Sequence, residues 1–338
     1  TTTLLKDTKG KVLNFDANYL ITGVNIIDDL LFWTDNLNPP RRLNVKKYYA
    51  PNIGPLFDSF YEDDISVIVK PPVNSPLITL TNSITLNQED NLRYKFIQFA
   101  CRYKYENDEY SAISPFSSTA FRPAIYSYDF GEGDFESMIN TYNRVDVDYF
   151  INGSNPGTGW IPDPRITEIQ LLFRDTASTN INVIDSFKIE NIINDPLLSI
   201  DANGRFTNTF DNNKIYTVLP PDEITRLFDN VPLKAKAQEL IGSRIAYGNY
   251  VQFYNIADSN GTPIDIDYQL EVLPLPLPTS IPLPTFRSDR DYEIGLVYLD
   301  DYSRMTTVLT SNVTNNTVHI PPTNSFTAND IRVSINNK

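Results

Sequence analysis

Closely spaced aspartates are the part of this sequence that most resembles a catalytic pair. They are Asp63 with Asp64, Asp289 with Asp291, and Asp300 with Asp301. A glycosidase needs two carboxyl groups that converge across a cleft at a defined separation. Neighbouring side chains of an extended strand point to opposite faces, so Asp300 and Asp301 do not converge by themselves. We therefore expect these acids to be solvated residues of turns.

Asp201-Ala202-Asn203-Gly204 has the opening of a calcium-binding loop. An EF-hand loop requires Gly at its sixth position and Glu at its twelfth. Counted from Asp201, these positions hold Phe206 and Asn212, which excludes such a loop. We predict a type I′ Asn-Gly turn here instead, and the same turn at Asn260-Gly261.

The residue types on which many enzymes and metal sites depend are scarce. The chain has one Cys, Cys101, and one His, His319, which excludes a disulfide framework, a zinc site built on cysteines and clustered histidine ligands. Gly131-Glu132-Gly133 lacks the third glycine of a dinucleotide fingerprint and puts a carboxylate where a phosphate would lie. We expect Cys101 in a core and His319 in a strand. We predict no catalytic residue, no cofactor and no metal, and therefore no enzyme.

The composition favours strands over helices. Among 338 residues are 24 Pro, 20 Tyr and 19 Phe. Proline breaks helix interiors and aromatic residues fit strands, so an all-β chain with little helix is predicted. The 28 basic and 42 acidic residues give a net charge of -14, which works against non-specific binding to a polyanion.

No segment is predicted to span a membrane. The most apolar-looking stretch, residues 270–284, is interrupted by Pro274, Pro276, Pro278, Pro282 and Pro284. A spanning helix needs about 20 predominantly apolar residues. The sequence begins at Thr1, which leads us to expect a piece of a longer chain.

Short strands open the chain, and we expect them at residues 11–15, 21–27 and 30–34. The last runs into a turn of Asp, Asn and Pro residues before Arg41-Arg42-Leu43. An apolar pair followed by an aromatic residue, Trp, Thr, Asp, a short turn and Pro-Arg is typical of a β-propeller blade of the YWTD type. We therefore predict Phe32 and Trp33 in or beside a packed core. A hairpin of some other β-protein is the alternative.

The middle of the chain reads as a sandwich. In a predicted strand over residues 92–105, the more apolar face carries Ile97, Phe99, Cys101 and Tyr103. The chain turns after it and returns over residues 110–115, as in the last two strands of a fibronectin type III sandwich. Further strands are predicted at residues 77–80, 83–86, 143–151, 167–174 and 182–189.

The clearest helix signal follows Pro220-Pro221. Asp222 is a candidate N-cap, and Ile224, Leu227 and Phe228 have helical spacing, so a helix over residues 222–228 is predicted. Residues 244–250 then resemble a returning propeller strand. We expect residues 231–254 to pack against the distant N-terminal segment.

A weak repeat links two hairpins. Residues 109–113 and 304–308 occupy the same place in each, which predicts two sandwich domains of one type. The predicted domains are residues 1–60 (propeller-type segment), 61–124 (fibronectin III-like sandwich), 125–219 (β-sandwich-like), 220–258 (short helix and returning propeller-type strands) and 259–338 (fibronectin III-like sandwich).

Several stretches together resemble one family. They are residues 21–35 with Pro39-Pro40-Arg41, 102–105 with 109–115, 169–175, 231–238 with 244–250, and 295–304. These stretches resemble the stabilization or muzzle protein of crAss-like phages, a tail nozzle protein. Ser303 departs from the pattern, because the family's Asp-x-Tyr-Gly-Arg turn has Gly there.

The resemblance implies a structural role in a virion. It implies a ring of subunits at the distal end of a short tail, with a propeller-type domain and sandwich domains around the channel for genome ejection. The implied partners are other copies of the chain, in a six-fold ring, and other phage tail proteins. DNA is a partner only in transit, no membrane is involved, and the family has no catalytic residue to transfer.

A secreted or surface carbohydrate-binding sandwich protein is the alternative, because sandwiches and propellers serve that use too. Trp160 with Asp163 is the best local candidate for a sugar site.

For a nozzle, we predict that acidic turns such as Asp63-Asp64 or Asp300-Asp301 lie near the channel, since an acidic wall repels phosphates. A wall formed by the cationic residues of the first unit would indicate a DNA-gripping role instead. These residues are Arg41, Arg42, Lys46 and Lys47.

Overall fold

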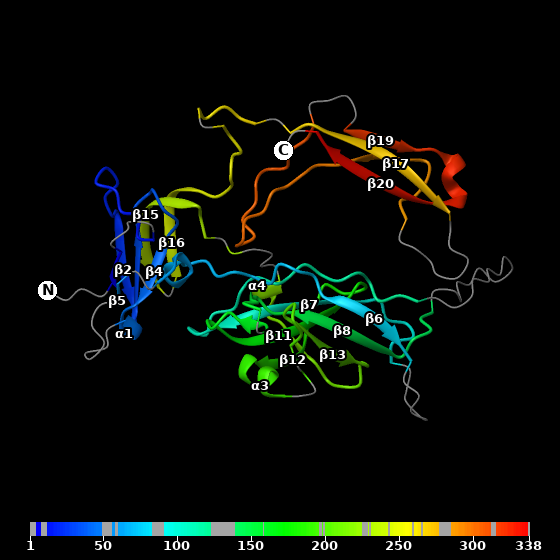
Figure 1. The fold of residues 1–338 in the computed structure, drawn as a ribbon, viewed down its shortest axis with the longest axis horizontal. Coiled ribbons are helices and arrows are strands. Elements are labelled where there is room, and N and C mark those ends of the chain that lie inside the picture. Colours follow the sequence, from blue (N-terminus) through cyan, green and yellow to red (C-terminus); the bar gives the residue numbers. More distant parts are fainter. Residues whose placement is uncertain are drawn as a thin grey trace. The chain divides into compact units, whose positions relative to one another are not determined.

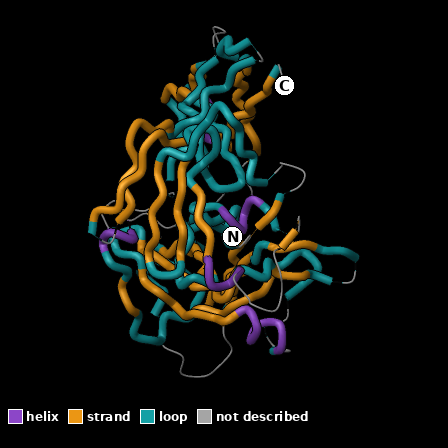
Figure 2. The backbone as a smooth tube through the Cα atoms, turned by 90° about the vertical axis from the view of Figure 1, so that its left-hand side faces the viewer, coloured by secondary structure: helices purple, strands orange, loops and turns teal. Residues whose placement is uncertain are grey.

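Strands dominate the structure and helices are short, as predicted (Figure 2). The computed structural model describes residues 5–7, 12–48, 56–57, 60–82, 91–122, 139–157, 159–195, 198, 200–224, 229, 231–242, 244–258, 260–264, 266–276, 285–311 and 316–336. Within these ranges the helical elements are α1 (Val45–Tyr48), α2 (Glu62–Ile65), α3 (Ile189–Asn194), α4 (Pro221–Ile224) and the 3-10 helix η2 (Pro322–Phe326). The chain is therefore all-β.

The chain divides into two compact units, each assembled from separate segments. Unit 1 consists of Thr1–Lys70, Asp229–Ile264 and Val297–Val308. Unit 2 consists of Pro71–Phe228, Asp265–Leu296 and Leu309–Lys338.

Unit 1 contains an antiparallel sheet of β2 (Gly23–Ile27), β3 (Leu30–Thr34) and β4 (Arg41–Asn44). Trp33 is 6% exposed and packs with Leu43, Phe60 and Ile65, and Phe32 is 7% exposed. Both aromatic residues are therefore in or beside a core, as predicted.

The predicted strand over residues 11–15 is absent from its described part, residues 12–15. The backbone N–H groups of Val12 and Leu13 donate instead to the Asp7 carboxylate, at 2.7 and 2.8 Å. This turn-like bonding occupies the groups that a strand ladder would need. Elsewhere in unit 1, β1 (Leu5–Lys6) pairs in parallel with β5 (Leu56–Phe57).

A hairpin of β15 (Lys234–Ile241) and β16 (Arg244–Val251) packs against the β2–β4 sheet (Figure 1). Thr34 Oγ1 donates to the Ala235 carbonyl at 2.7 Å, and Gln238 Nε2 donates to Asn25 Oδ1 at 2.8 Å. A Cβ at Gly23 would lie 2.7 Å from that of Gln238, so this approach requires glycine. The predicted packing of residues 231–254 on the N-terminal segment is confirmed.

Unit 2 contains a sandwich of two sheets (Figure 1). In one sheet the strand order is β14 (Thr217–Val218), β12 (Asn182–Lys188), β11 (Ile166–Asp175) and β7 (Ile97–Tyr105). In the other it is β13 (Arg205–Phe210), β8 (Arg144–Phe150) and β6 (Leu77–Thr81). Phe210 joins the sheets, because its ring centroid lies 5.2 Å from that of Phe99 and 5.0 Å from that of Phe173.

The face of β7 that was predicted to be apolar is buried, and Cys101 is a free thiol within it. Burial raises the pKa of Cys101 to about 12. The strand begins at Ile97 rather than residue 92, because Leu92 and Lys95 form a turn closed by a 3.1 Å backbone hydrogen bond. The strand predicted at residues 83–86 lies outside the described residues.

The chain that returns along β7 pairs with it through serines at every third position. The N–H groups of Ser111, Ser114 and Ser117 donate to the carbonyls of Tyr103, Cys101 and Phe99. Their hydroxyls accept, at 3.0 Å each, from the N–H groups of the same three residues. The predicted return is thus in place, but it steps three residues for every two of β7 and forms no regular strand.

Two helices differ from expectation. The helix predicted from Asp222 begins at Pro221, whose fixed φ suits the first helical position, and residues 225–228 lie outside the described ranges. Asp222 therefore lies in the first turn and is not the N-cap. The longer helix α3 follows β12 directly and buries Ile189 and Ile192, and the sequence analysis did not predict it.

The C-terminal segments of unit 2 form two antiparallel strand pairs. Strand β17 (Tyr268–Pro276) pairs with β20 (Thr327–Ile335), and β18 (Arg290–Glu293) pairs with β19 (Thr317–Ile320). His319 lies in β19, as predicted. The remaining short strands of unit 2, β9 (Gly153–Ser154) and β10 (Ile161–Pro162), pair with each other.

Candidate functional site

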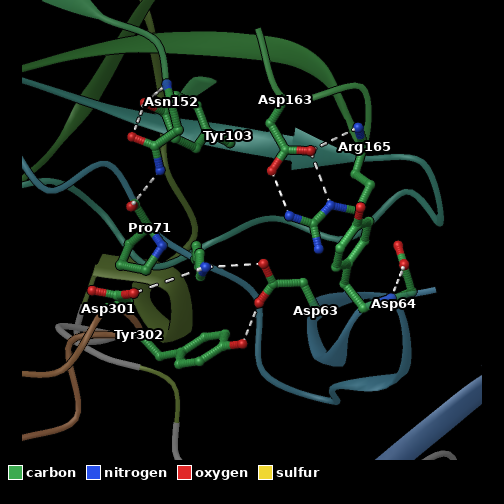
Figure 3. A network of polar contacts seen from close by, with 11 residues as sticks. Asp63, Asp64, Pro71, Tyr103, Asn152, Asp163, Arg165, Asp301 and Tyr302 are labelled. Atoms are coloured by element: carbon green, nitrogen blue, oxygen red, sulfur yellow. Dashed lines mark hydrogen bonds and ion pairs between the residues drawn. The ribbon is translucent and has the colours of Figure 1, made fainter. Parts of the chain in front are cut away.

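Two of the acidic pairs meet in one polar cluster of unit 1 (Figure 3). Asp63 is on α2, and Asp301 and Tyr302 are in the turn of the hairpin Val297–Val308. The Asp63 carboxylate accepts a hydrogen bond from the Tyr302 hydroxyl and pairs with Lys70 Nζ at 2.9 Å. Lys70 Nζ also lies 4.0 Å from the Asp301 carboxylate. The cluster thus fixes the tip of this hairpin to α2.

Asp300 lies in the same hairpin turn and binds a buried arginine. Arg304 Nε donates to Asp300 Oδ2 at 2.7 Å, and the Tyr254 hydroxyl donates to the same oxygen at 2.8 Å. The Arg304 guanidinium carbon lies 5.1 Å from the ring centroid of Tyr302 and 5.7 Å from that of Tyr254. This is an aromatic cage around an internal cation.

The prediction of solvated turn acids holds for Asp301 and fails for Asp63 and Asp300. The Asp301 side chain is 87% exposed, whereas those of Asp63 and Asp300 are 20% and 22% exposed. Asp63 is also in a helix, where its neighbour Asp64 accepts from the Tyr61 N–H at 2.8 Å. Sequence reasoning missed this because Tyr302 is far from Asp63 in the chain, and Tyr254 is far from Asp300.

The pKa shifts match a cluster of fixed charges rather than of proton carriers. Burial acts to raise the pKa of Asp300, but hydrogen bonds from Arg304 and Tyr254 outweigh it and lower that pKa. Burial, and then hydrogen bonding to Asp63, raise the pKa of Tyr302 far above its usual value. Asp300 therefore stays ionised and Tyr302 stays a donor at neutral pH, which suits anchoring and not acid–base catalysis.

Asp300 also opens a turn that recurs at Asp201 and Asp258. In each, the first residue accepts a hydrogen bond from the backbone N–H three residues later, and its own N–H donates to the carbonyl four residues later. Its Oδ1 accepts from the N–H groups two and four residues ahead. Among the described residues of these turns, only the fourth has a positive φ: Gly204, Gly261 and Ser303. The predicted type I′ turns at Asn203 and Asn260 are therefore wrong, because neither Asn has the positive φ that type I′ requires.

Trp160 and Asp163, the candidate sugar-binding residues, do not form an exposed aromatic platform with a neighbouring acid. The Trp160 ring lies against the backbone at Gly204, where an added Cβ would be 2.4 Å from it. Asp163 pairs with Arg165 at 2.5 Å (Figure 3). Asp291, of the remaining acidic pair, binds His319 Nδ1 at 2.8 Å, and Asp289 has a φ of 58°.

A groove of about 650 Å³ on the sandwich of unit 2 was not predicted. Its lining mixes charges of both signs with apolar groups, including Lys104, Glu106, Ile161, Lys188 and Ile193. Among the described residues, no group of three or more His, Cys, Asp or Glu side chains is placed to hold a metal ion. Nor do these residues include a helix with the length and hydropathy to cross a membrane.

No protein-family model matches the chain, and no curated protein is detectably similar to it in sequence.

Proposed function

We propose that this chain is a structural subunit of a short phage tail, one copy of a ring around the channel for genome ejection. The proposal starts from the stretches that resemble the muzzle or nozzle family, of which residues 21–35 and 231–250 are the most specific. Its partners are other copies of the chain and other tail proteins. DNA passes through without specific binding.

One observation carries the proposal: unit 1 is assembled from segments that are far apart in the chain. The two most specific stretches, separated by most of the sandwich, pack together through Thr34, Ala235, Asn25 and Gln238. A propeller-type platform interrupted by inserted sandwiches requires such an assembly. An unrelated hairpin in the first stretch has no reason to bind the second.

Strand pairing supports one fibronectin III-like sandwich in a changed chain order. The sheet β6-β8-β13 has the pairing of strands A, B and E of that fold, and β12, β11, β7 and residues 110–120 have the pairing of C′, C, F and G. The F–G hairpin then precedes strand B in the chain.

The polar cluster supports a mechanical role for the hairpin Val297–Val308. The charged groups of Asp63, Asp300 and Arg304 bind partners inside unit 1. These bonds hold the hairpin to α2 and to Tyr254. We favour this over carbohydrate binding, because Asp163 is occupied by Arg165 and Trp160 packs on its own chain.

Immunogold electron microscopy tests the proposal. Antibodies raised against the purified chain are applied to particles of the virus whose genome encodes it. Label confined to the distal end of the tail is the expected result. Label on the capsid alone, or particles that lack the chain by mass spectrometry, would overturn it, and a glycan array then tests the alternative.

A further inference from the structure

A short segment of unit 1 exposes an unusual amount of apolar surface. Between residues 15 and 26, six large apolar side chains are exposed, and Leu20, Ile26 and Val24 are 74%, 63% and 58% exposed. The set, which we name the β2 apolar face, is Phe15, Tyr19, Leu20, Ile21, Val24 and Ile26. Exposed large apolar side chains gathered in one short segment mark an interaction site more often than scattered single residues do.

The charges around this face are acidic. Asp16, Asp28 and Asp29 are exposed, and residues 15–29 include no Lys or Arg. The Asp29 carboxylate forms a loose ion pair with Lys46 Nζ at 3.7 Å, and both side chains are mostly exposed. Such a pair contributes little and leaves the acidic character in place.

A second exposed apolar surface lies on the β15–β16 hairpin and its continuation. Ile241 is 64% exposed, and Val251 and Phe253 are 42% exposed. Its exposed cations are Lys234, Lys236 and Arg244, Glu239 is the one acid between residues 234 and 251, and no ion pair within the described part of the chain involves the three cations. We name this set the hairpin face.

The two faces cannot cover each other within one copy. Strand β15 packs on the side of the sheet that carries Gly23 and Asn25. Because side chains alternate along a strand, Val24 and Ile26 point to the other side. Any surface that covers Val24 and Ile26 with the cations of the hairpin face must therefore come from a second molecule.

We propose that the β2 apolar face of one copy docks on the hairpin face of a second copy of the chain. Both faces combine exposed apolar groups with charges, and their net charges are of opposite sign, because three cations outnumber Glu239 on the hairpin face. A contact between two different faces is heterologous, and it closes into a ring when the rotation between copies permits. The inference deepens the proposed function and rests on it for the ring, whereas the contact itself follows from unit 1.

Sedimentation equilibrium of the purified chain tests the contact. We expect concentration-dependent association that Leu20→Ser and Ile26→Ser each weaken about tenfold or more, since each removes apolar area from the contact. Ile215→Ser is the matched control, because Ile215 is fully exposed on unit 2 and outside both faces. A monomeric wild-type chain, or equal weakening by Ile215→Ser, overturns the proposal.

Charge reversal adds a test that misfolding cannot imitate. One variant carries Asp16→Lys with Asp29→Lys, and the other carries Lys234→Glu with Lys236→Glu. Each alone should lose association, because its two faces then have net charges of the same sign, and an equimolar mixture should regain it. Failure of the mixture overturns the pairing of faces. A monomeric chain that still labels the tail overturns the contact alone, while a self-associating chain absent from particles overturns the tail function alone.

Discussion

Asp108 and Ser303 occupy the same left-handed position in two hairpins that are far apart in the chain, with φ of 60° and 61°. The N–H of each donates, at 3.0 Å, to the carbonyl three residues earlier, Tyr105 in one hairpin and Asp300 in the other. Farther up the arms, Ser111 donates to Tyr103 and Thr306 donates to Tyr298 in the same way. The sequence repeat between residues 109–113 and 304–308 is therefore a repeat of geometry.

Ser303→Gly should stabilise the chain. The left-handed conformation costs a non-glycine residue about 1–2 kcal/mol. Glycine avoids this cost but loses more conformational entropy on folding, so the net stabilisation is about 0.5–1 kcal/mol. Urea unfolding measures it. Ser334→Gly, in β20, is the control and should destabilise, because glycine weakens a strand interior. A loss of stability in Ser303→Gly would show that its side chain, not its backbone, determines the turn.

The elements that follow a two-residue period were the ones that sequence reasoning could place. Strand β3 begins and ends as predicted, and the buried face of β7 is the predicted one. The return along β7 follows another rule, since its serine hydroxyls accept the hydrogen bonds that backbone carbonyls accept in a regular ladder. Nothing in a hydropathy pattern reports that substitution.

Ser114→Ala tests this unusual pairing. The buried Ser114 hydroxyl accepts a hydrogen bond from the Cys101 N–H at 3.0 Å. Removing the hydroxyl leaves this buried N–H without that acceptor. Such a donor costs about 1–3 kcal/mol. Ser118→Ala is the matched control at an exposed position of the same segment and should change the free energy of unfolding by less than about 0.5 kcal/mol. Equal effects in the two variants would mean that the hydroxyl contributes nothing specific.

The polar cluster was beyond sequence reasoning for a different reason. Asp63 and Tyr302 look like unrelated surface residues until three separate segments fold into unit 1. The identity of Asp300 as a turn residue was readable from its neighbours, but its bond to Tyr254 was not. Local rules predict turns, whereas contacts between distant segments depend on the assembled fold.

Trp33→Ala should destabilise the chain by about 3–5 kcal/mol, because it empties a buried site between Leu43 and Ile65. Thermal unfolding followed by circular dichroism measures the loss. Ile215→Ala, at a fully exposed position, serves as the control and should leave the melting temperature nearly unchanged. An unchanged melting temperature in Trp33→Ala would place the indole outside the core and remove the basis of the blade interpretation.

Acid should weaken the anchoring of the hairpin Val297–Val308. The pKa of Asp300 is lower in the folded chain than the value of about 3.9 for a free Asp, so the unfolded state binds more protons as the pH falls. The stabilisation is therefore complete above about pH 4 and is lost as pH falls through the folded pKa. Urea unfolding at pH 6 and pH 3 should show a smaller acid loss in Asp300→Asn than in wild type. Asp301→Asn, at an exposed neighbour, should retain the wild-type loss, and equal losses in all three would contradict this account.

The acidic-channel hypothesis now has a sharper form. Of the acids considered, Asp301 is free to face a channel, since its side chain is 87% exposed, whereas Asp63 is held by Lys70 and Tyr302. Of the opposing cations, Arg41 is 3% exposed and donates to the Leu13 carbonyl, so it is not available to line a wall. Lys46 and Lys47 are exposed. A reconstruction of the assembled ring, coloured by electrostatic potential, tests the prediction that acidic turns lie near the channel.

Duplex DNA binding by the purified chain supplies the last test. With a net charge of -14, the chain should release few counterions from DNA, so we expect a dissociation constant weaker than about 10⁻⁴ M at physiological salt. Fluorescence anisotropy with a labelled duplex measures it, and lowering the salt should strengthen binding only slightly. Lys46→Glu with Lys47→Glu should change nothing. Micromolar binding with a steep salt dependence that this double variant abolishes would contradict free passage and indicate that the chain grips DNA through these lysines.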